Sequence, residues 1–465
     1  MPMTAIKVKR SNAWYSALLE PVPLTIIAIV YTALAVLSLF AVPRSSPVYN
    51  LVSMVTLPAV VITPMIFISL PIRNLYKGII IGVLLAVVMP VIGIYFPEYL
   101  DTVIQICIYA CLALGLNVVV GYAGLLDLGY VAFFAVGAYL WGMFTSQART
   151  IFFQNGWLVE ATMFNFLAFV LLGAILAAGV GIILGLPVLR VRGDYLAIVT
   201  LGFGEIIRII ARNLDRPINY TNGALGLNNI AKPPSDWLVD PTSSIITFLN
   251  TTVRPLRIDK PENVANNLLI YALALLLLLI VIVISHRLEN SPIGRAWTAI
   301  REDEVAAVAM GVPKLGMKLR AFSLGATFGG AIGVIFAAKN TFIDPNSFLL
   351  LASISILSMV IIGGMGGIKG VILGAIMVRL VELHILTNLS LQINSMKNNN
   401  VVIPIVNFDM GTLSPELDPT KFKPLMFGLI LVCMMLFRPE GLLPATRRRL
   451  ELEEARTEDN VAQGG

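Results

Sequence analysis

Charged residues are scarce in this 465-residue chain: Asp, Glu, Lys and Arg make up 13% of it, whereas hydrophobic residues make up 57%. An ordinary soluble domain carries about 25% charged and about 45–50% apolar residues. The polar side chains are therefore too few to cover a soluble globule. This composition excludes a soluble enzyme, a disordered chain and a secreted disulfide scaffold, and it predicts a multi-span membrane protein.

Residues that bind metals or act as nucleophiles are also few, with three cysteines and two histidines in the whole chain. Cys107 and Cys111 lie in an apolar run, where we expect small apolar fillers, and His286 and His384 are far apart. No Gly-Lys-Ser/Thr sequence for cradling phosphate occurs. We therefore expect no catalytic residue, no metal and no cofactor bound by this chain. The mild excess of Lys and Arg, 33 against 27 acidic residues, gives no reason to invoke nucleic acid.

Long apolar runs are what the sequence has in abundance. A membrane-spanning helix needs about 20 mostly apolar residues. Twelve runs meet or approach that length: Pro23–Ala41, Val52–Leu70, Gly78–Phe96, Thr102–Val120, Leu125–Met143, Phe164–Pro187, Tyr195–Ile210, Leu268–Ser285, Ala321–Ala338, Leu351–Met365, Gly367–Leu386 and Pro424–Phe437. The fifth, seventh, tenth and eleventh are short or interrupted, as broken or re-entrant helices are. The prediction is an all-α polytopic membrane protein with about 12 (10–12) transmembrane or broken helices.

The distribution of Lys and Arg predicts the orientation. Basic residues gather in the first segment, in alternate loops and at the end of the chain, as cytoplasmic segments do. Both termini are thus expected in the cytoplasm. The first segment (1–22), the basic loop at 287–320 and the polar tail (445–465) are therefore expected to be cytoplasmic.

A glycine-rich stretch at 115–139 interrupts one apolar region. Gly121, Gly124 and Gly129 can let helices approach closely or let a helix break. Asp127, beside Tyr130, is costly to expose to lipid and should face protein or water. Two interpretations remain open: a packing face with Asp127 at the inner interface, and a lining of the transport pathway.

Two further stretches carry polar or small residues at membrane depth. Glu205 and Arg208 are three apart and can pair on one helical face, either as a structural pair or as part of a pathway. Between Ser353 and Gly370 a serine-rich run ends in clustered glycines, including Gly363, Gly364 and Gly366. This cluster indicates a broken helix or a tight helix crossing, and close packing without substrate contact is an equal alternative.

The predicted cytoplasmic loop contains an amphipathic segment, Ser291–Arg320. Good helix formers precede Gly311 and Pro313, which should end the helix. Such a helix, held at the membrane surface between two spans, is typical of a docking element for a cytoplasmic partner. An ordinary solvated loop is the alternative.

Several stretches together resemble one transporter family. GYAGLLDLGYVAFFAVGAYL, RGDYLAIVTLGFGEIIRI, GRAWTAIREDEVAAVAMGV, GGMGG and FRPEGLLP are similar, in order, to the LivM-type permease of high-affinity branched-chain amino acid ABC importers. The resemblance implies that 102–444 is the permease core and that 23–101 is a three-span extension before it. It also implies that its cytoplasmic loop couples to an ATPase through Arg301, Glu302, Asp303, Glu304, Ala306, Ala307 and Gly311.

The resemblance further implies a bacterial inner-membrane importer of leucine, isoleucine and valine. Its expected partners are a homologous second permease, two ATP-binding subunits that use the ATP, and a periplasmic substrate-binding protein. Related permeases carry urea, amides or other amino acids. An ion-coupled secondary transporter using Asp127 and Glu205 is a further alternative, and an intramembrane enzyme is disfavoured because clustered carboxylates and a His pair are lacking.

Overall fold

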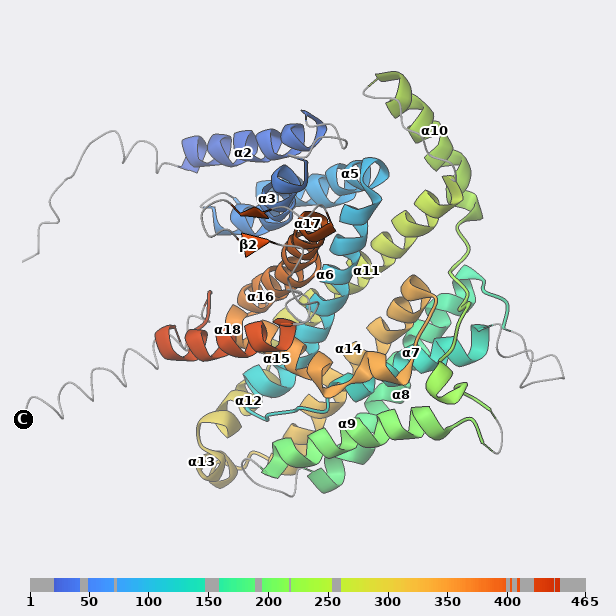
Figure 1. The fold of residues 1–465 in the computed structure, drawn as a ribbon. Coiled ribbons are helices and arrows are strands. Elements are labelled where there is room, and N and C mark those ends of the chain that lie inside the picture. Colours follow the sequence, from blue (N-terminus) through green and yellow to red (C-terminus); the bar gives the residue numbers. More distant parts are fainter. Residues whose placement is uncertain are drawn as a thin grey trace, which may run out of the picture. The chain divides into compact units, whose positions relative to one another are not determined.

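The computed structural model describes residues 21–41, 49–70, 73–146, 159–188, 195–216, 219–252, 261–398, 402–403, 408–409, 422–438 and 440–443. The expected N-terminal segment up to residue 20 and the C-terminal tail lie outside these residues. Contacts divide the chain into two units, Met1–Ile92 and Gly93–Gly465. Figure 1 shows their helices.

The first unit consists of apolar helices. Helix α2 (Pro21–Ala41) packs against α3 (Tyr49–Ser69), and α4 (Asn74–Val83) continues through a π-turn, η1 (Leu84–Val88), into α5 (Met89–Tyr95). Ala28, Phe67 and Leu70 form its buried cluster.

The second unit is helical as well. Its elements are α6 (Pro97–Asn117), η2 (Val118–Tyr122), α7 (Val131–Thr145), α8 (Met163–Val188), α9 (Tyr195–Asn213), η4 (Gly223–Leu225), α10 (Asp236–Thr252), α11 (Pro261–Glu289), α12 (Pro292–Glu302), α13 (Glu304–Ala309), α14 (Lys314–Asn340), η5 (Pro345–Phe348), α15 (Leu350–Gly363), α16 (Ile368–Leu380), η6 (Val381–Ile385), α17 (Leu386–Asn398), β1 (Val402–Ile403), β2 (Phe408–Asp409) and α18 (Lys423–Phe437). The β1–β2 pair is two residues long and antiparallel. The predicted all-α class is thus confirmed.

Seven helices in the described part of the chain are long and apolar enough to cross a membrane. They are Leu75–Tyr95, Pro97–Tyr122, Met163–Val188, Pro261–Glu289, Lys314–Asn340, Pro345–Gly363 and Ile368–Ser395. Shorter apolar helices cover Thr25–Ser38, Val55–Ser69, Val131–Thr145 and Gly428–Phe437. The chain is therefore a multi-pass membrane protein, and the count of about 12 and the side of each terminus stay predictions.

Helix α9, the seventh predicted span, is absent from both groups and carries Glu205, Arg208 and Arg212. It contacts α7. Near its start, the Thr200 hydroxyl accepts a hydrogen bond from the N–H of Leu128, just before α7 begins. Near its end, Thr221 donates a hydrogen bond to the carbonyl of Ala211.

Helix α14 is the centre of the second unit and packs against α6, α7 and α8. Glycines make these contacts close: a Cβ at Gly137 would lie 2.9 Å from the Cα of Gly330. A Cβ at Gly330 would lie 2.9 Å from the carbonyl carbon of Gly173, and nearer still to its oxygen. Small residues that let backbones approach in this way are typical of helix packing in membranes.

Candidate functional site

The chain is interrupted between η2 and α7, over residues 123–130, which we call the first break. Gly124 takes a left-handed conformation there, with φ +67°. Asp127 is 1% exposed, and its Oδ1 accepts a hydrogen bond of 2.9 Å from the backbone N–H of Gly129. Thus Asp127 lies in the protein interior, as the cost of exposing it to lipid predicts.

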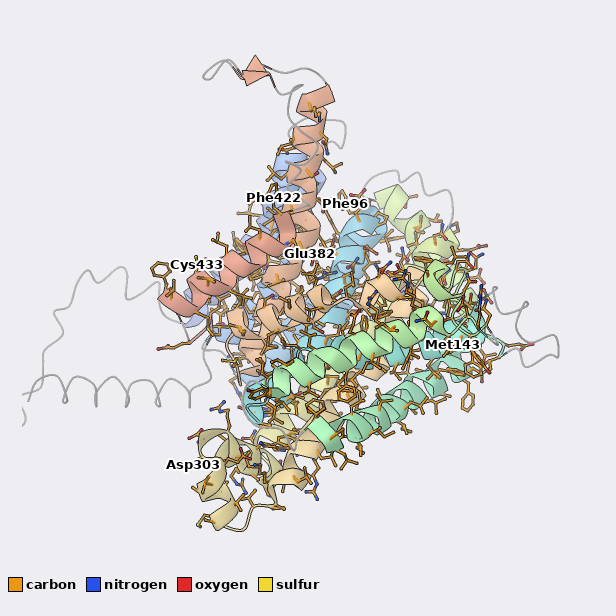
Figure 2. The ribbon with its side chains drawn as sticks, turned by 60° about the horizontal axis from the view of Figure 1, so that its bottom comes forward. Phe96, Met143, Asp303, Glu382, Phe422 and Cys433 are labelled. Carbon is orange, nitrogen blue, oxygen red and sulfur yellow. The ribbon has the colours of Figure 1, made fainter. Side chains whose placement is uncertain are left out.

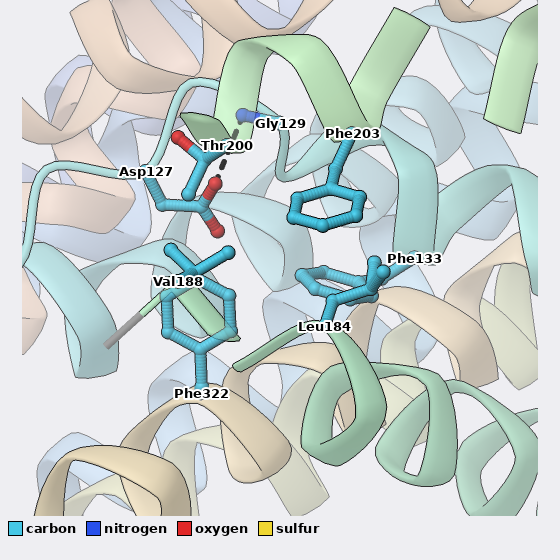
Figure 3. Close-up of a pocket in the computed structure, with 8 residues that line it drawn as sticks. All are labelled: Asp127, Gly129, Phe133, Leu184, Val188, Thr200, Phe203 and Phe322. Carbon is cyan, nitrogen blue, oxygen red and sulfur yellow. Dashed lines mark hydrogen bonds between the residues drawn. The ribbon is translucent and has the colours of Figure 1, made fainter. Parts of the chain in front are cut away.

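A small cavity adjoins Asp127. Figure 3 shows the carboxylate between Thr200 and the apolar side chains of Val188 and Phe322. The cavity holds about 10 Å³, which is room for one water molecule and no more. An amino acid does not fit in this cavity, and Asp127 holds the first break through its hydrogen bond to the N–H of Gly129.

Tyr130, the last residue of the first break, is fully buried. Its hydroxyl donates a 2.9 Å hydrogen bond to the carbonyl of Gly325 on α14. The next backbone N–H, that of Val131, donates to the Ser353 hydroxyl on α15. The predicted site residue Tyr130 therefore ties the start of α7 to α14, while Ser353 ties it to α15.

The predicted glycine cluster forms a second break, residues 364–367, between α15 and α16. Gly364 and Gly366 have φ values of +114° and +85°, which L side chains rarely adopt. Gly363 approaches the carbonyl of Gly370 so closely that no Cβ fits between them. A Cβ at Gly374 would be blocked in the same way by the carbonyl of Met359, so α15 and α16 turn back on each other and cross tightly, which is one of the alternatives that the sequence left open.

The second break is covered by the segment that follows α18. Leu442 donates a 2.8 Å hydrogen bond to the carbonyl of Ile362, and Leu443 donates to that of Gly363. The last carbonyls of a helix lack partners within it. The closing sequence therefore caps the end of α15 beside the glycine cluster.

Glu205 and Arg208 pair with each other on α9, with Arg208 Nε 2.9 Å from Glu205 Oε1. The Glu205 side chain is 42% exposed and the Arg208 side chain 15%. Among the described residues no hydrogen bond or ion pair joins Glu205 to Asp127, although the neighbouring Gly204 lies against Gly129 of the first break.

The predicted docking segment forms two helices, so the expectation of one continuous helix is wrong. Helix α12 ends at Glu302, and Asp303 begins α13 by accepting hydrogen bonds from the N–H groups of Val305 and Ala306. An aspartate at this N-cap position ends one helix and starts another. Helix α13 stops before Gly311, whose φ of +86° is the left-handed conformation predicted for it.

Figure 2 shows Asp303 at the tip of this α12–α13 pair, away from Phe96 and Glu382. The pair is fastened to α14: Trp297 is fully buried and donates a 2.7 Å hydrogen bond to the carbonyl of Met317. Glu304 forms ion pairs with Lys314 and Lys318, both on α14. Glu304 thus acts within the chain.

Helix α13 presents an apolar surface, formed by Val305 (79% exposed), Val308 (49%) and Met310 (84%). We call these three residues the α13 patch. Ala306 is exposed beside them, whereas Ala307 is 4% exposed and packs inward. Of the two alanines predicted to face a partner, the structure therefore presents only Ala306.

Arg301, also predicted to face a partner, turns toward its own chain. Its side chain is 18% exposed, and Nη1 donates a 2.7 Å hydrogen bond to the carbonyl of Gly121 in η2. Glu302 beside it is exposed. The structure thus brings Arg301 to Gly121, Gly124 and Gly366, and leaves Glu302 on the surface.

Two residues at the breaks, Asn117 and Thr200, escaped the sequence analysis, and a third, Ser353, was noted only as the start of a serine-rich run. Each uses a polar side chain to bind backbone at a break, and Asn117 Oδ1 accepts a 2.8 Å hydrogen bond from the N–H of Gly366. A lone Asn, Thr or Ser in an apolar run is a weak signal. The glycines of α14 were also missed, although the spacing of Gly325 and Gly329 is a recognisable small-residue pattern.

Comparison with known proteins identifies related chains. The sequence profile of the family described as "Branched-chain amino acid transport system / permease component" matches residues 99–435. The chain is 35% identical over 368 residues to the "High-affinity branched-chain amino acid transport system permease protein LivM" of Salmonella typhimurium, covering 78% of this chain and 74% of that protein. Its identity to the Escherichia coli protein of the same name is 36% over 352 residues, 74% of this chain and 70% of that one. A "Probable branched-chain amino acid transport permease protein LivM" of Methanocaldococcus jannaschii is 22% identical, over 72% of this chain and 90% of that one. No solved structure matches.

Proposed function

Because this chain belongs to the family of permease components of branched-chain amino acid transport systems, we propose that it is the membrane permease subunit of an ATP-driven importer of leucine, isoleucine and valine. The observation that carries the proposal is the family match over residues 99–435, which includes both breaks and the α12–α13 pair. ATP is hydrolysed by separate ATP-binding subunits. A homologous second permease completes the pathway, and a periplasmic binding protein delivers the substrate.

The membrane arrangement supports this role. Helix α9 lies against the first break, where its Thr200 accepts a hydrogen bond from the N–H of Leu128. We propose that α9 crosses the bilayer, with the Glu205–Arg208 pair reducing the cost of its charges. With both termini and the α12–α13 pair in the cytoplasm of a bacterium, the chain lies in the inner membrane.

The α13 patch is the proposed docking surface for an ATP-binding subunit. Exposed apolar residues grouped on a projecting helix are typical of an interaction site. The docking experiment replaces Val305 by Asp and measures how much ATP-binding subunit copurifies with the permease. We expect a loss of about tenfold or more, since a buried charge without a partner costs several kcal/mol at an interface. Leu225→Asp is the control and should retain the subunit, because Leu225 is equally exposed and lies two residues from Leu227, which pairs with Ile343 beyond the opposite end of α14 from α13.

The substrate proposal has its own experiment. Membrane vesicles containing the whole transporter are supplied with ATP, binding protein and one labelled compound at a time: leucine, isoleucine, valine, alanine, acetamide or urea. Uptake limited to the three branched-chain amino acids supports the proposal. Uptake of urea or acetamide without leucine would assign the chain to an amide importer.

A further inference from the structure

The α12–α13 pair packs against α14 and the end of α11, and it also contacts η2. The residue of the pair that forms a hydrogen bond with η2 is Arg301, the second-last residue of α12. Its guanidinium crosses to η2 and donates to the carbonyl of Gly121 at 2.7 Å. Because η2 ends the helix, this carbonyl lacks the N–H of a following turn, and a cation is the favoured partner at such a C-terminus.

The first break is shaped to admit the Arg301 side chain. A Cβ at Gly124 would lie 2.5 Å from the Cγ of Arg301 and 3.2 Å from its Cβ. Only glycine leaves room for the aliphatic part of the arginine there. The positive φ of Gly124 serves the same approach, since it turns the chain away just after η2.

The contact between Arg301 and Gly121 also lies beside the second break. Asn117, one turn before Gly121, accepts a 2.8 Å hydrogen bond from the N–H of Gly366. A Cβ at Gly366 would lie 3.7 Å from both Arg301 Nη1 and the carbonyl oxygen of Gly121. One arginine and one asparagine therefore join α12, the first break and the second break.

We propose that Arg301 is a positioning residue that transmits movement of the α12–α13 pair to both helix breaks. This inference rests on the proposed function, in which an ATP-binding subunit moves that pair. A displacement of about 1 Å takes a 2.7 Å hydrogen bond beyond the range of a good one, so the breaks must follow the pair or lose the contact. Arg301 therefore controls transport without forming part of the docking surface.

The experiment uses the complete transporter in proteoliposomes and compares Arg301→Ala with wild type. Two quantities are measured: the ATP-binding subunit that copurifies, and the leucine imported per ATP hydrolysed. We expect Arg301→Ala to retain the subunit but to import about tenfold less leucine per ATP, the factor supported by one hydrogen bond to a charged group. Arg301→Lys keeps a donor and should recover most of the import.

Arg295→Ala is the matched control, because it removes the same charge from an exposed position of the same helix. It should leave both quantities at their wild-type values. Asn117→Ala should reproduce the Arg301→Ala loss, and the double variant should be little worse than either alone because both residues act in one network.

Three results would overturn the inference. Wild-type import per ATP in Arg301→Ala would show that the contact transmits nothing. Loss of the ATP-binding subunit from Arg301→Ala would place the residue in docking instead. If the wild-type chain retains no ATP-binding subunit, the proposed function itself is contradicted. Failure of the proposed function can therefore be distinguished from failure of the inference about Arg301.

Discussion

The close contact of α14 with α8 can be tested by adding a single methyl group. In the structure, a Cβ at Gly330 would lie 2.9 Å from the carbonyl carbon of Gly173, and the carbonyl oxygen and the Ala177 side chain would be nearer still. Helix backbones are the obstacle, so the two helices must separate to admit the methyl. Gly330→Ala should therefore weaken the packing at the centre of the second unit.

The expected size follows from two opposing effects. Overpacking a tightly packed site costs about 1–3 kcal/mol, whereas Gly→Ala inside a helix contributes about 0.5–1 kcal/mol of stability. The net expectation for Gly330→Ala is a destabilisation of about 1–2 kcal/mol. Gly179→Ala is the control: it lies in α8 with no atom within 4 Å of the new Cβ, and only the helix-stabilising effect of about 0.5–1 kcal/mol remains.

The assay follows helical structure by circular dichroism while purified protein in mild detergent is titrated with sodium dodecyl sulfate. Gly330→Ala should unfold at a lower concentration than wild type, and Gly179→Ala at the same or a higher one. Equal midpoints for the two variants would refute the reasoning, because the backbones would then not be in contact at Gly330.

Four further expectations concern the breaks, α13 and the topology. The Asp127→Leu protein should insert normally but transport less, because the N–H of Gly129 loses its hydrogen-bond acceptor, at a cost of about 1–3 kcal/mol. Asp127→Asn keeps an acceptor oxygen and should have a milder effect. Full transport by the leucine variant would show that this hydrogen bond is not needed. Gly311→Ala should lower retention of the ATP-binding subunit. A residue with a side chain pays about 1–2 kcal/mol to adopt the φ of +86° found at Gly311, although no atom lies close enough to clash with the new Cβ. Ala307→Phe should lower retention too, by displacing α13 from its buried contact, and unchanged copurification of either variant would show that α13 does not dock. Cysteines placed at Ser291 and at Asn266 should be labelled from opposite sides of the membrane, and same-side labelling would end the proposed arrangement.

Features that depend only on neighbouring residues, such as helix length and helix ends, could be predicted from the sequence. The length of the apolar runs predicted helices such as α8 and α11, because hydrocarbon thickness sets that length. Clustered glycines predicted the second break, since positive φ values favour glycine. The N-cap preference of aspartate could have predicted that Asp303 divides the docking segment in two.

Long-range contacts could not be predicted in this way. Asn117 and Gly366 are 249 positions apart, and Arg301 and Gly121 are 180 apart. No periodicity shows that two such residues meet, because their contact depends on how several helices pack together. For the same reason the sequence did not show that the side chains of Arg301 and Ala307 pack inward while that of Val305 is exposed.

The most direct measurement of the central claim is leucine accumulation in proteoliposomes that contain the chain with its second permease and ATP-binding subunits, and binding protein on the opposite side. ATP supplied on the side of the α13 patch should drive accumulation that persists when ionophores collapse every ion gradient, and that Val305→Asp abolishes. Accumulation by this chain alone, driven by an ion gradient without ATP, would contradict the account and identify a secondary transporter.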